Sequence, residues 1–508
     1  MAINQLKAGA ALSYLIIIFN ILIGVLYTPY MLRELGQAEY GLYSLAASLI
    51  AYLTLLDLGF GNAIIRYTAK FRAEGREQEQ GEMYGMFLKL YVAIGAVALL
   101  IGVALMANVG TMFGETMNTT EMQRMRIIIA LMSLNLAFTF PLSIFGSIIT
   151  AYENFLFQRV VSLIRMLLNP AVMVLLLFLG YKAIALVVVT TLFNLGSLMV
   201  NWWYCRKRLK VKIRHGKFRW LFFREIFVYS FWIFLNAIMD RIYWSSGQFI
   251  LGIYKGTVAV AIYAVAIQLQ QLYMLFSTAI SGVFLPKVTA IASRGEEVER
   301  ELSDLFIRTG RIQYSVMAFI LSGFILLGRP FITLWAGEDY TQAYTITLLF
   351  FIPLTVPLIQ NLGITILQAQ NRMKFRSVLY VSIALASLIL SILLAPKYGG
   401  VGCAIATAAA LVVGQIVVMN IYYHRRIRID ILRFWREIGG MSLVPLLLLA
   451  LGWYLGSFYE ISSIGQFVVA AAIFSILYLP LFYRFSLNSY ERGLLGDVTR
   501  KILMRFRG

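Results

Sequence analysis

Charged side chains inside hydrophobic segments are the residues of this sequence whose types could do chemistry. Long apolar runs contain Asp57, Lys89, Arg165, Asp240 and Arg241. A charge at the centre of a bilayer costs about 2.5–3.5 kcal/mol on insertion scales, so such a side chain usually faces a cavity or a partner. Guanidinium groups match phosphate oxygens bidentately. The arginines therefore predict anion binding within a membrane, and the aspartates predict binding of a proton or a sodium ion.

The stretch NAIMDRIYWSSGQ (236–248) gathers most of this polarity. Residues three and four apart share a helix face, so Asn236, Asp240 and Trp244 form one stripe and Arg241 begins the next. We expect this arc to line an aqueous cavity. A salt bridge between Asp240 and a basic residue on another helix is the alternative. The predicted cavity residues are Arg241, Asp240, Asp57, Asn236, Arg66, Arg165, Gln268, Gln271 and Trp244.

The elements that must position these residues are membrane-spanning helices. Of the 508 residues, 60% are hydrophobic and 13% are charged, against about 45–50% and about 25% in soluble domains. Runs this apolar satisfy their backbone groups only as helices, so the predicted fold class is an all-α polytopic membrane protein with about 14 transmembrane helices. The expected spans lie near 10–31, 41–66, 86–108, 126–150, 158–180, 183–205, 225–251, 257–285, 312–335, 343–368, 376–395, 400–423, 437–456 and 463–483.

The distribution of lysine and arginine predicts the orientation. One set of alternate loops, together with both termini, holds roughly 34 basic residues against about 7 on the other side, which is a positive-inside asymmetry. We expect both termini to be cytoplasmic. The net charge of +20 follows from these loops, so the sequence does not predict nucleic acid as a partner.

The sequence predicts no catalytic site, no metal and no cofactor. Cys205 and Cys403 are too few for a disulfide scaffold, and neither has metal-ligand neighbours. The two histidines, His215 and His424, lie in basic loops. The predicted external loops offer only scattered carboxylates, one or two in each, where a membrane-embedded polymerase or glycosyltransferase would need a catalytic loop. We therefore do not expect an enzyme.

An internal repeat with an offset of about 218–220 residues divides the chain. ELGQAEYGLYSLAASL (34–49) lies over YKGTVAVAIYAVAIQL (254–269), which pairs Gly36 with Gly256. AYENFLFQRVV (151–161) lies over AQNRMKFRSVL (369–379), and YCRKRL (204–209) over YYHRRI (422–427). Two copies of six helices enter from the same side, so a pseudo-twofold axis along the membrane normal should relate them. The predicted domains are an N-lobe at 1–210, a basic cytoplasmic linker at 211–224, a C-lobe at 225–428, and two added helices with a basic cytoplasmic tail at 429–508.

Four stretches carry a resemblance to a known family. They are EYGLYSLAASLIAYLTLLDLGFGNAIIRYTAKF near the start, MDRIYWSSGQFILGIYKGTVAVAIYAVAIQLQQL, LGRPFITLWAGEDYTQAYTITLL, and ILQAQNRMKF. The chain resembles the polysaccharide-biosynthesis flippases, of O-antigen or teichoic-acid type, in the multidrug/oligosaccharidyl-lipid/polysaccharide exporter superfamily. The resemblance implies a MATE-like fold of two six-helix lobes plus two helices.

The resemblance also implies a function. A polyprenyl-diphosphate-linked oligosaccharide would be flipped from the inner to the outer leaflet of a bacterial or archaeal cytoplasmic membrane by alternating access, for surface polysaccharide assembly. Arg241, helped by Arg66 or Arg165, would pair with the lipid diphosphate, while Asp240 and Asp57 would couple transport to protons or sodium ions. Polymerases and glycosyltransferases would be functional neighbours. The alternative is a cation-coupled multidrug exporter of the same superfamily.

Overall fold

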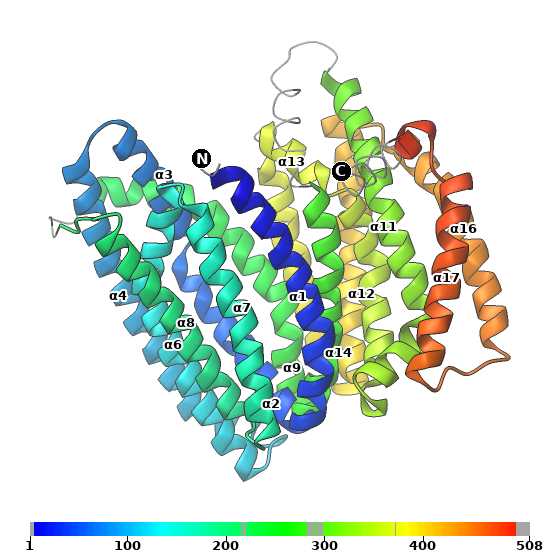
Figure 1. Cartoon of the computed structure of the whole chain (residues 1–508), viewed down its shortest axis with the longest axis horizontal. Coiled ribbons are helices and arrows are strands. Elements are labelled where there is room, and N and C mark those ends of the chain that lie inside the picture. Colours follow the sequence, from blue (N-terminus) through cyan, green and yellow to red (C-terminus); the bar gives the residue numbers. More distant parts are fainter. Residues whose placement is uncertain are drawn as a thin grey trace, which may run out of the picture. The chain divides into compact units, whose positions relative to one another are not determined.

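The computed structural model (Figure 1) describes residues 5–214, 216, 220–281, 288, 291, 298–370 and 372–493. These residues are almost all helical, and no strand occurs among them. The chain divides into two compact units, Met1–Ala264 with Leu388–Cys403, and Val265–Ser387 with Ala404–Gly508. The predicted lobe boundaries come from the repeat rather than from compactness, and they stay a prediction.

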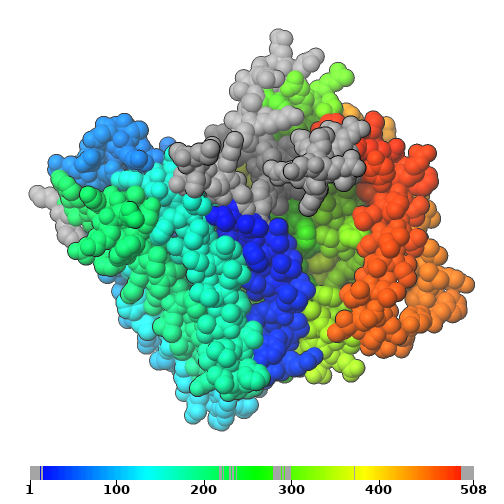
Figure 2. All heavy atoms as spheres, viewed as in Figure 1, coloured from blue at the N-terminus to red at the C-terminus, as the bar shows by residue number. Residues whose placement is uncertain are grey.

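The first unit is a bundle in which α4 packs on α6, α6 on α8, and α1 along α7 (Figures 1 and 2). Its elements are α1 (Gln5–Leu35), α2 (Gln37–Leu53), the 3₁₀ turn η1 (Thr54–Asp57), α3 (Phe60–Ala73), α4 (Glu77–Ala107), α5 (Val109–Phe113), α6 (Thr119–Ala151), α7 (Phe155–Phe178), α8 (Ala183–Lys207) and the first part of α9 (Trp220–Ser281).

The second unit is organised around α11, which packs on α12, α16 and α17. Most side chains of α17 are exposed, as expected for a helix that faces lipid (Figure 2). The elements after α9 are α11 (Val298–Trp335), the 3₁₀ turn η3 (Glu338–Tyr340), α12 (Gln342–Ile359), α13 (Leu362–Ala369), α14 (Met373–Ala410), the π-helical η4 (Leu411–Val418), α15 (Met419–Tyr422), the π-helical η5 (Tyr423–Ile427), α16 (Ile431–Gly456) and α17 (Ile464–Phe485).

In the described residues, 12 helical runs are long and apolar enough to cross a membrane. Two of them, of 42 and 55 residues, would measure about 63 and 83 Å as straight helices, far more than the hydrocarbon core of about 30 Å. Each contains a glycine with non-helical backbone angles, Gly256 (φ 78°, ψ −173°) and Gly399 (φ 56°, ψ −136°). The predicted count of about 14 spans is not confirmed. Fourteen spans result only if each of these two long runs crosses the membrane twice.

The backbone repeats the sequence pairing of Gly36 with Gly256. Gly36, between α1 and α2, has φ 75° and ψ 167°, close to the angles of Gly256 and in a region that essentially only glycine occupies. The same correspondence occurs where α8 and η5 end. Lys210 (φ 50°) and Arg428 (φ 62°) are both left-handed although neither is glycine.

Side-chain contacts repeat in the same register. Phe157 stacks on Tyr204 with ring centroids 3.8 Å apart, and Phe375 stacks on Tyr422 at 4.1 Å. The backbone N–H of Val211 donates to the Cys205 carbonyl at 3.0 Å, and that of Ile429 donates to the Tyr423 carbonyl at 3.0 Å. The repeat read from the sequence therefore corresponds to two copies of one local structure.

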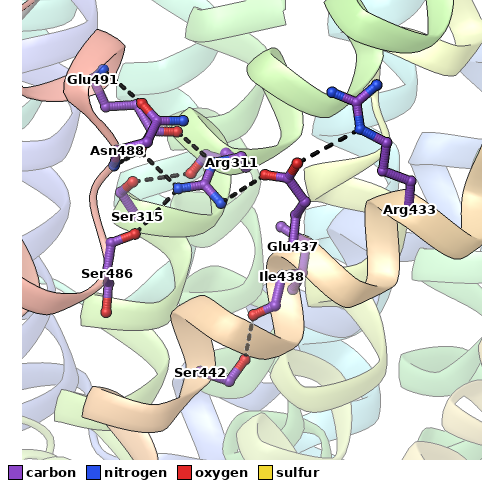
Figure 3. A network of polar contacts seen from close by, with 9 residues as sticks. All are labelled: Arg311, Ser315, Arg433, Glu437, Ile438, Ser442, Ser486, Asn488 and Glu491. Atoms are coloured by element: carbon purple, nitrogen blue, oxygen red, sulfur yellow. Dashed lines mark hydrogen bonds and ion pairs between the residues drawn. The ribbon is translucent and has the colours of Figure 1, made fainter.

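A buried charge network joins three parts of the second unit (Figure 3). Arg311 of α11 is 7% exposed and bonds to Glu491, which is 4% exposed, and to Glu437 of α16. Arg433 donates to Asp304 at 2.7 Å, which adds a second link between α11 and α16. The expected spans 257–285 and 312–335 leave Arg311 in a loop, and the sequence missed this network because the partners are 126 and 180 positions away.

Candidate functional site

Asp57 lies at a break in the second predicted span. The 3₁₀ turn η1 ends at Asp57, Leu58 (φ 52°) and Gly59 (φ 75°) take left-handed angles, and α3 begins at Phe60. A left-handed conformation costs an ordinary residue roughly 1–2 kcal/mol, so the break is imposed by its surroundings. The sequence predicted an unbroken helix here, and the glycines of LDLGFGN were the available signal.

The carboxylate at this break has a defined partner. Tyr91 of α4, which is fully buried, donates its hydroxyl to Asp57 Oδ1 at 2.7 Å. Asp57 also precedes the N-terminus of α3, where the helix dipole favours a negative charge. Half-helices that end at a polar residue within the membrane are typical of transporter binding sites. Asp57 is thus held in place as an acceptor at a broken span.

Arg165 lies ten residues beyond the start of α7, about 15 Å along the helix. This is well inside the span rather than at the end that the charge distribution predicts to be cytoplasmic. Its Nη1 donates to Asn194 Oδ1 at 3.0 Å and to Ser197 Oγ at 3.5 Å, both on α8. Asn194 in turn donates to Asn135 Oδ1 at 2.9 Å and to Thr139 Oγ1 at 2.8 Å on α6. Three helices therefore build one polar cluster around the guanidinium.

The Nη2 and Nε groups of Arg165 are available to a ligand. The side chain is exposed, and its hydrogen bonds with described residues go from Nη1 to neutral oxygens. A guanidinium carries five N–H donors, so Nη2 and Nε can bind an anion while Nη1 stays anchored. The sequence selected Arg165 but missed Asn194, Asn135 and Thr139, whose signal was amides and a hydroxyl in otherwise apolar segments.

Arg241 lies in the first part of α9 and is half-buried, while Asp240 beside it is exposed. Tyr52 of α2 donates its hydroxyl to the Arg241 carbonyl at 3.4 Å, which places this part of α9 against α2. The Arg241 guanidinium forms no ion pair with any residue that the structure describes. Trp244 is half-buried, with its ring 5.2 Å from that of Tyr243.

The other predicted cavity residues have different surroundings. Arg66 of α3 is exposed, with its guanidinium 5.8 Å from the ring of Tyr67. Gln268 is half-buried and Gln271 exposed, and both belong to the second unit. Asn236 lies within α9, but its side chain is outside the described part of the chain. That these residues share one cavity with Arg241 stays a prediction.

Together the spans, the broken helices and the intramembrane polar contacts define a multi-pass membrane protein of transporter type. The chain belongs to the polysaccharide biosynthesis protein family, whose model matches residues 6–292. This confirms the family that the sequence resembles.

Two curated relatives extend over most of the chain. A putative O-antigen transporter of Shigella flexneri is 21% identical over 79% of this chain and 94% of its own length. A probable flippase, AglR of Haloferax volcanii, is 21% identical over 82% of this chain and 83% of its own length.

Solved structures confirm the MATE-like fold class. The lipid II flippase MurJ in an inward closed conformation is similar with a TM-score of 0.70 and 17% identity, covering 94% of this chain and 98% of that one. An inward-facing multidrug resistance MATE family transporter is similar with a TM-score of 0.59 and 13% identity, covering 82% and 99%.

Proposed function

We propose that this protein flips a polyprenyl-diphosphate-linked oligosaccharide from the inner to the outer leaflet of the cytoplasmic membrane by alternating access. The family membership supports a role in polysaccharide biosynthesis. The Shigella relative is named as a putative O-antigen transporter and the Haloferax relative as a probable flippase, which supports transfer of a lipid-linked glycan across the membrane. In this proposal both termini are cytoplasmic, and enzymes that build and polymerise the repeat unit are its functional neighbours.

The main support for the proposal is that two intramembrane arginines lack a carboxylate partner among the described residues. Among the described residues, the hydrogen bonds of Arg165 go to neutral oxygens, and Arg241 has no carboxylate partner. A charge within a membrane segment is costly unless it faces a cavity or a partner, and a bidentate phosphate contact would supply that partner to each guanidinium. The diphosphate of the carrier lipid supplies such an anion. A cationic drug would instead be repelled, which disfavours the multidrug-exporter alternative.

Coupling to an ion gradient is the second part of the proposal. Asp57, at the break between η1 and α3, would take up a proton or a sodium ion, with Asp240 as a further candidate. One charge crossing a potential of 100 mV yields about 2.3 kcal/mol. Protonation of Asp57 would remove the charge that the α3 N-terminus favours, and this change would bias the broken span toward another conformation.

The test is complementation of a deletion strain. Deletion should trap lipid-linked repeat units in the inner leaflet and remove surface polysaccharide, and the wild-type gene should restore it. Arg165→Gln and Arg241→Gln should restore less than about a tenth of surface polysaccharide at equal membrane abundance. Arg76→Gln is the matched control, because Arg76 is paired with Glu74 and Glu79 outside the spans. Unchanged polysaccharide together with reduced efflux of cationic dyes would reject the flippase in favour of the drug exporter.

A further inference from the structure

The turn of α9 at Gly256 is pressed against the helices of the first repeat. A Cβ at Gly41 of α2 would overlap the Thr257 carbonyl oxygen, so only glycine permits this approach. A Cβ at Gly256 would lie 2.9 Å from the Thr116 carbonyl oxygen. All these residues belong to the first unit. Two backbone segments here therefore meet with no side chain between them.

Hydrogen bonds fasten the same contact. Thr257 Oγ1 donates to Glu121 Oε1 at 2.9 Å, and Glu121 lies in the first turn of α6. Thr116 Oγ1 donates to the Gly252 carbonyl at 2.8 Å. A bond to a carboxylate is worth roughly twice a neutral one, so the Thr257–Glu121 bond is the stronger of the two.

Apolar side chains pack next to these hydrogen bonds. Leu45 of α2 is fully buried and packs directly on Gly252 of α9. A Cβ added at Gly252 would lie 2.6 Å from a methyl group of Leu45. Phe113 of α5 meets Phe249 of α9 edge to face, with ring centroids 6.3 Å apart. The seam between α2 and α9 is closed to water at this end, which the charge distribution predicts to be external.

The opposite end of the seam has a different closure. Tyr67 of α3 donates its hydroxyl to Glu225 Oε1 at 2.8 Å, close to the start of α9. Phe222 contacts the Tyr67 ring edge to face at 5.0 Å, and Phe223 lies 5.9 Å from Phe60. Aromatic ring contacts and the Tyr67–Glu225 hydrogen bond hold this predicted cytoplasmic end, and Arg241 lies on α9 between the two ends.

We propose that the contact among Gly41, Glu121 and Thr257 is the outer gate of this protein, and that the Tyr67–Glu225 contact is the inner gate. This inference rests on the proposed transport function and names the parts of α2, α3, α6 and α9 that separate during the cycle. The outer gate opens by parting of Thr257 from Gly41 and Glu121, and the inner gate opens by parting of Glu225 from Tyr67. The anion held at Arg241 then meets one side of the membrane at a time.

The experiment measures access to a cysteine placed inside the outer seam. Leu45→Cys is made in a chain with Cys205→Ala and Cys403→Ala, and intact spheroplasts are treated with a membrane-impermeant maleimide. Gly41→Val should raise the labelling rate at position 45 by about tenfold or more, and Thr257→Val by several-fold, because each weakens the closed seam. Tyr67→Phe should lower the rate several-fold, since it favours opening of the other end. Gly196→Ala, at a helical glycine with open space, should leave the rate unchanged.

Labelling at the background rate in Thr257→Val, with the protein present in the membrane, would overturn the gate. So would labelling that requires permeabilised membranes, because position 45 would then face the cytoplasm. Thr257→Val keeps the shape of the side chain, so it decides the question even where Gly41→Val fails to fold. The readout needs no substrate: raised labelling with unaffected surface polysaccharide in the deletion strain would keep the gate and reject the proposed substrate.

Discussion

Arg311 and Glu491 form a two-pronged ion pair, with Nε 2.6 Å from Oε1 and Nη2 2.9 Å from Oε2 (Figure 3). The pair connects α11 to the segment that follows α17. Removing one partner from a buried pair costs about 3–5 kcal/mol because the other charge remains buried. The loss of stability in Glu491→Gln should lie near the lower end of that range, since Glu437 still contacts Arg311 at 3.0 Å. Unfolding of the purified protein in detergent measures the loss.

The matched control for this pair is Arg428→Gln. Arg428 and Glu299 are 3.2 Å apart but both are exposed, and exposed pairs contribute at most about 1 kcal/mol. The unfolding midpoint of Arg428→Gln should therefore change little. Equal losses in Glu491→Gln and Arg428→Gln would show that burial does not strengthen the Arg311 network.

The repeated glycines give a second prediction. Gly36→Ala and Gly256→Ala should each destabilise the protein by about 1–3 kcal/mol, because alanine is strained at these backbone angles. Gly256→Ala should cost more, since its Cβ would also meet the Thr116 carbonyl, whereas the space beside Gly36 is open. Thermal unfolding of the two variants compares the costs. Equal losses would mean that backbone strain accounts for the whole effect.

Asn194 should act through Arg165. Asn194→Leu removes the main anchor of the guanidinium, and a bond to a charged group is worth about 1.5–3 kcal/mol. Restoration of surface polysaccharide should therefore fall by about tenfold or more, because each 1.4 kcal/mol is a factor of ten. Thr150→Val, which removes a hydroxyl of α6 that is bonded to Gln158 of α7, is the control. Full export by Asn194→Leu would remove the cluster from the site.

Asp57→Asn tests the proposed coupling. Asparagine keeps an oxygen that accepts from Tyr91 but lacks the charge that would bind a proton or attract a sodium ion, so export should lose its dependence on an imposed ion gradient. Substrate transfer in inverted vesicles, measured with and without a proton or sodium gradient, checks this. Tyr91→Phe leaves the carboxylate in place and should retain the dependence. A gradient-dependent Asp57→Asn would exclude Asp57 as the coupling residue.

The sequence predicted features that depend on composition and on local pattern. Long apolar runs required helices, and the pairing of Gly36 with Gly256 located two turns of the same shape. Arg165 and Arg241 could be selected because a charge is conspicuous in an apolar segment. None of these inferences needs knowledge of which helices touch.

The sequence did not predict features that depend on contacts between distant segments. Nothing near Arg311 indicates that Glu491 will neutralise it, and the neutral partners of Arg165 come from α8 and α6. The glycines after Leu58 were a signal for the break that follows Asp57, but nothing in the sequence indicates that Leu58 itself takes left-handed angles. Tertiary surroundings impose that conformation, and a one-dimensional pattern does not record them.

The length of α11 has a practical consequence. Its 38 residues extend about 57 Å, nearly twice the hydrocarbon thickness, and Arg433 braces its early turns through Asp304. Image alignment in electron cryomicroscopy depends on rigid mass outside the detergent belt. A helical fiducial domain could be fused in helical register to the early part of α11. It would provide a rigid feature outside the detergent belt for a chain that is mostly embedded in lipid.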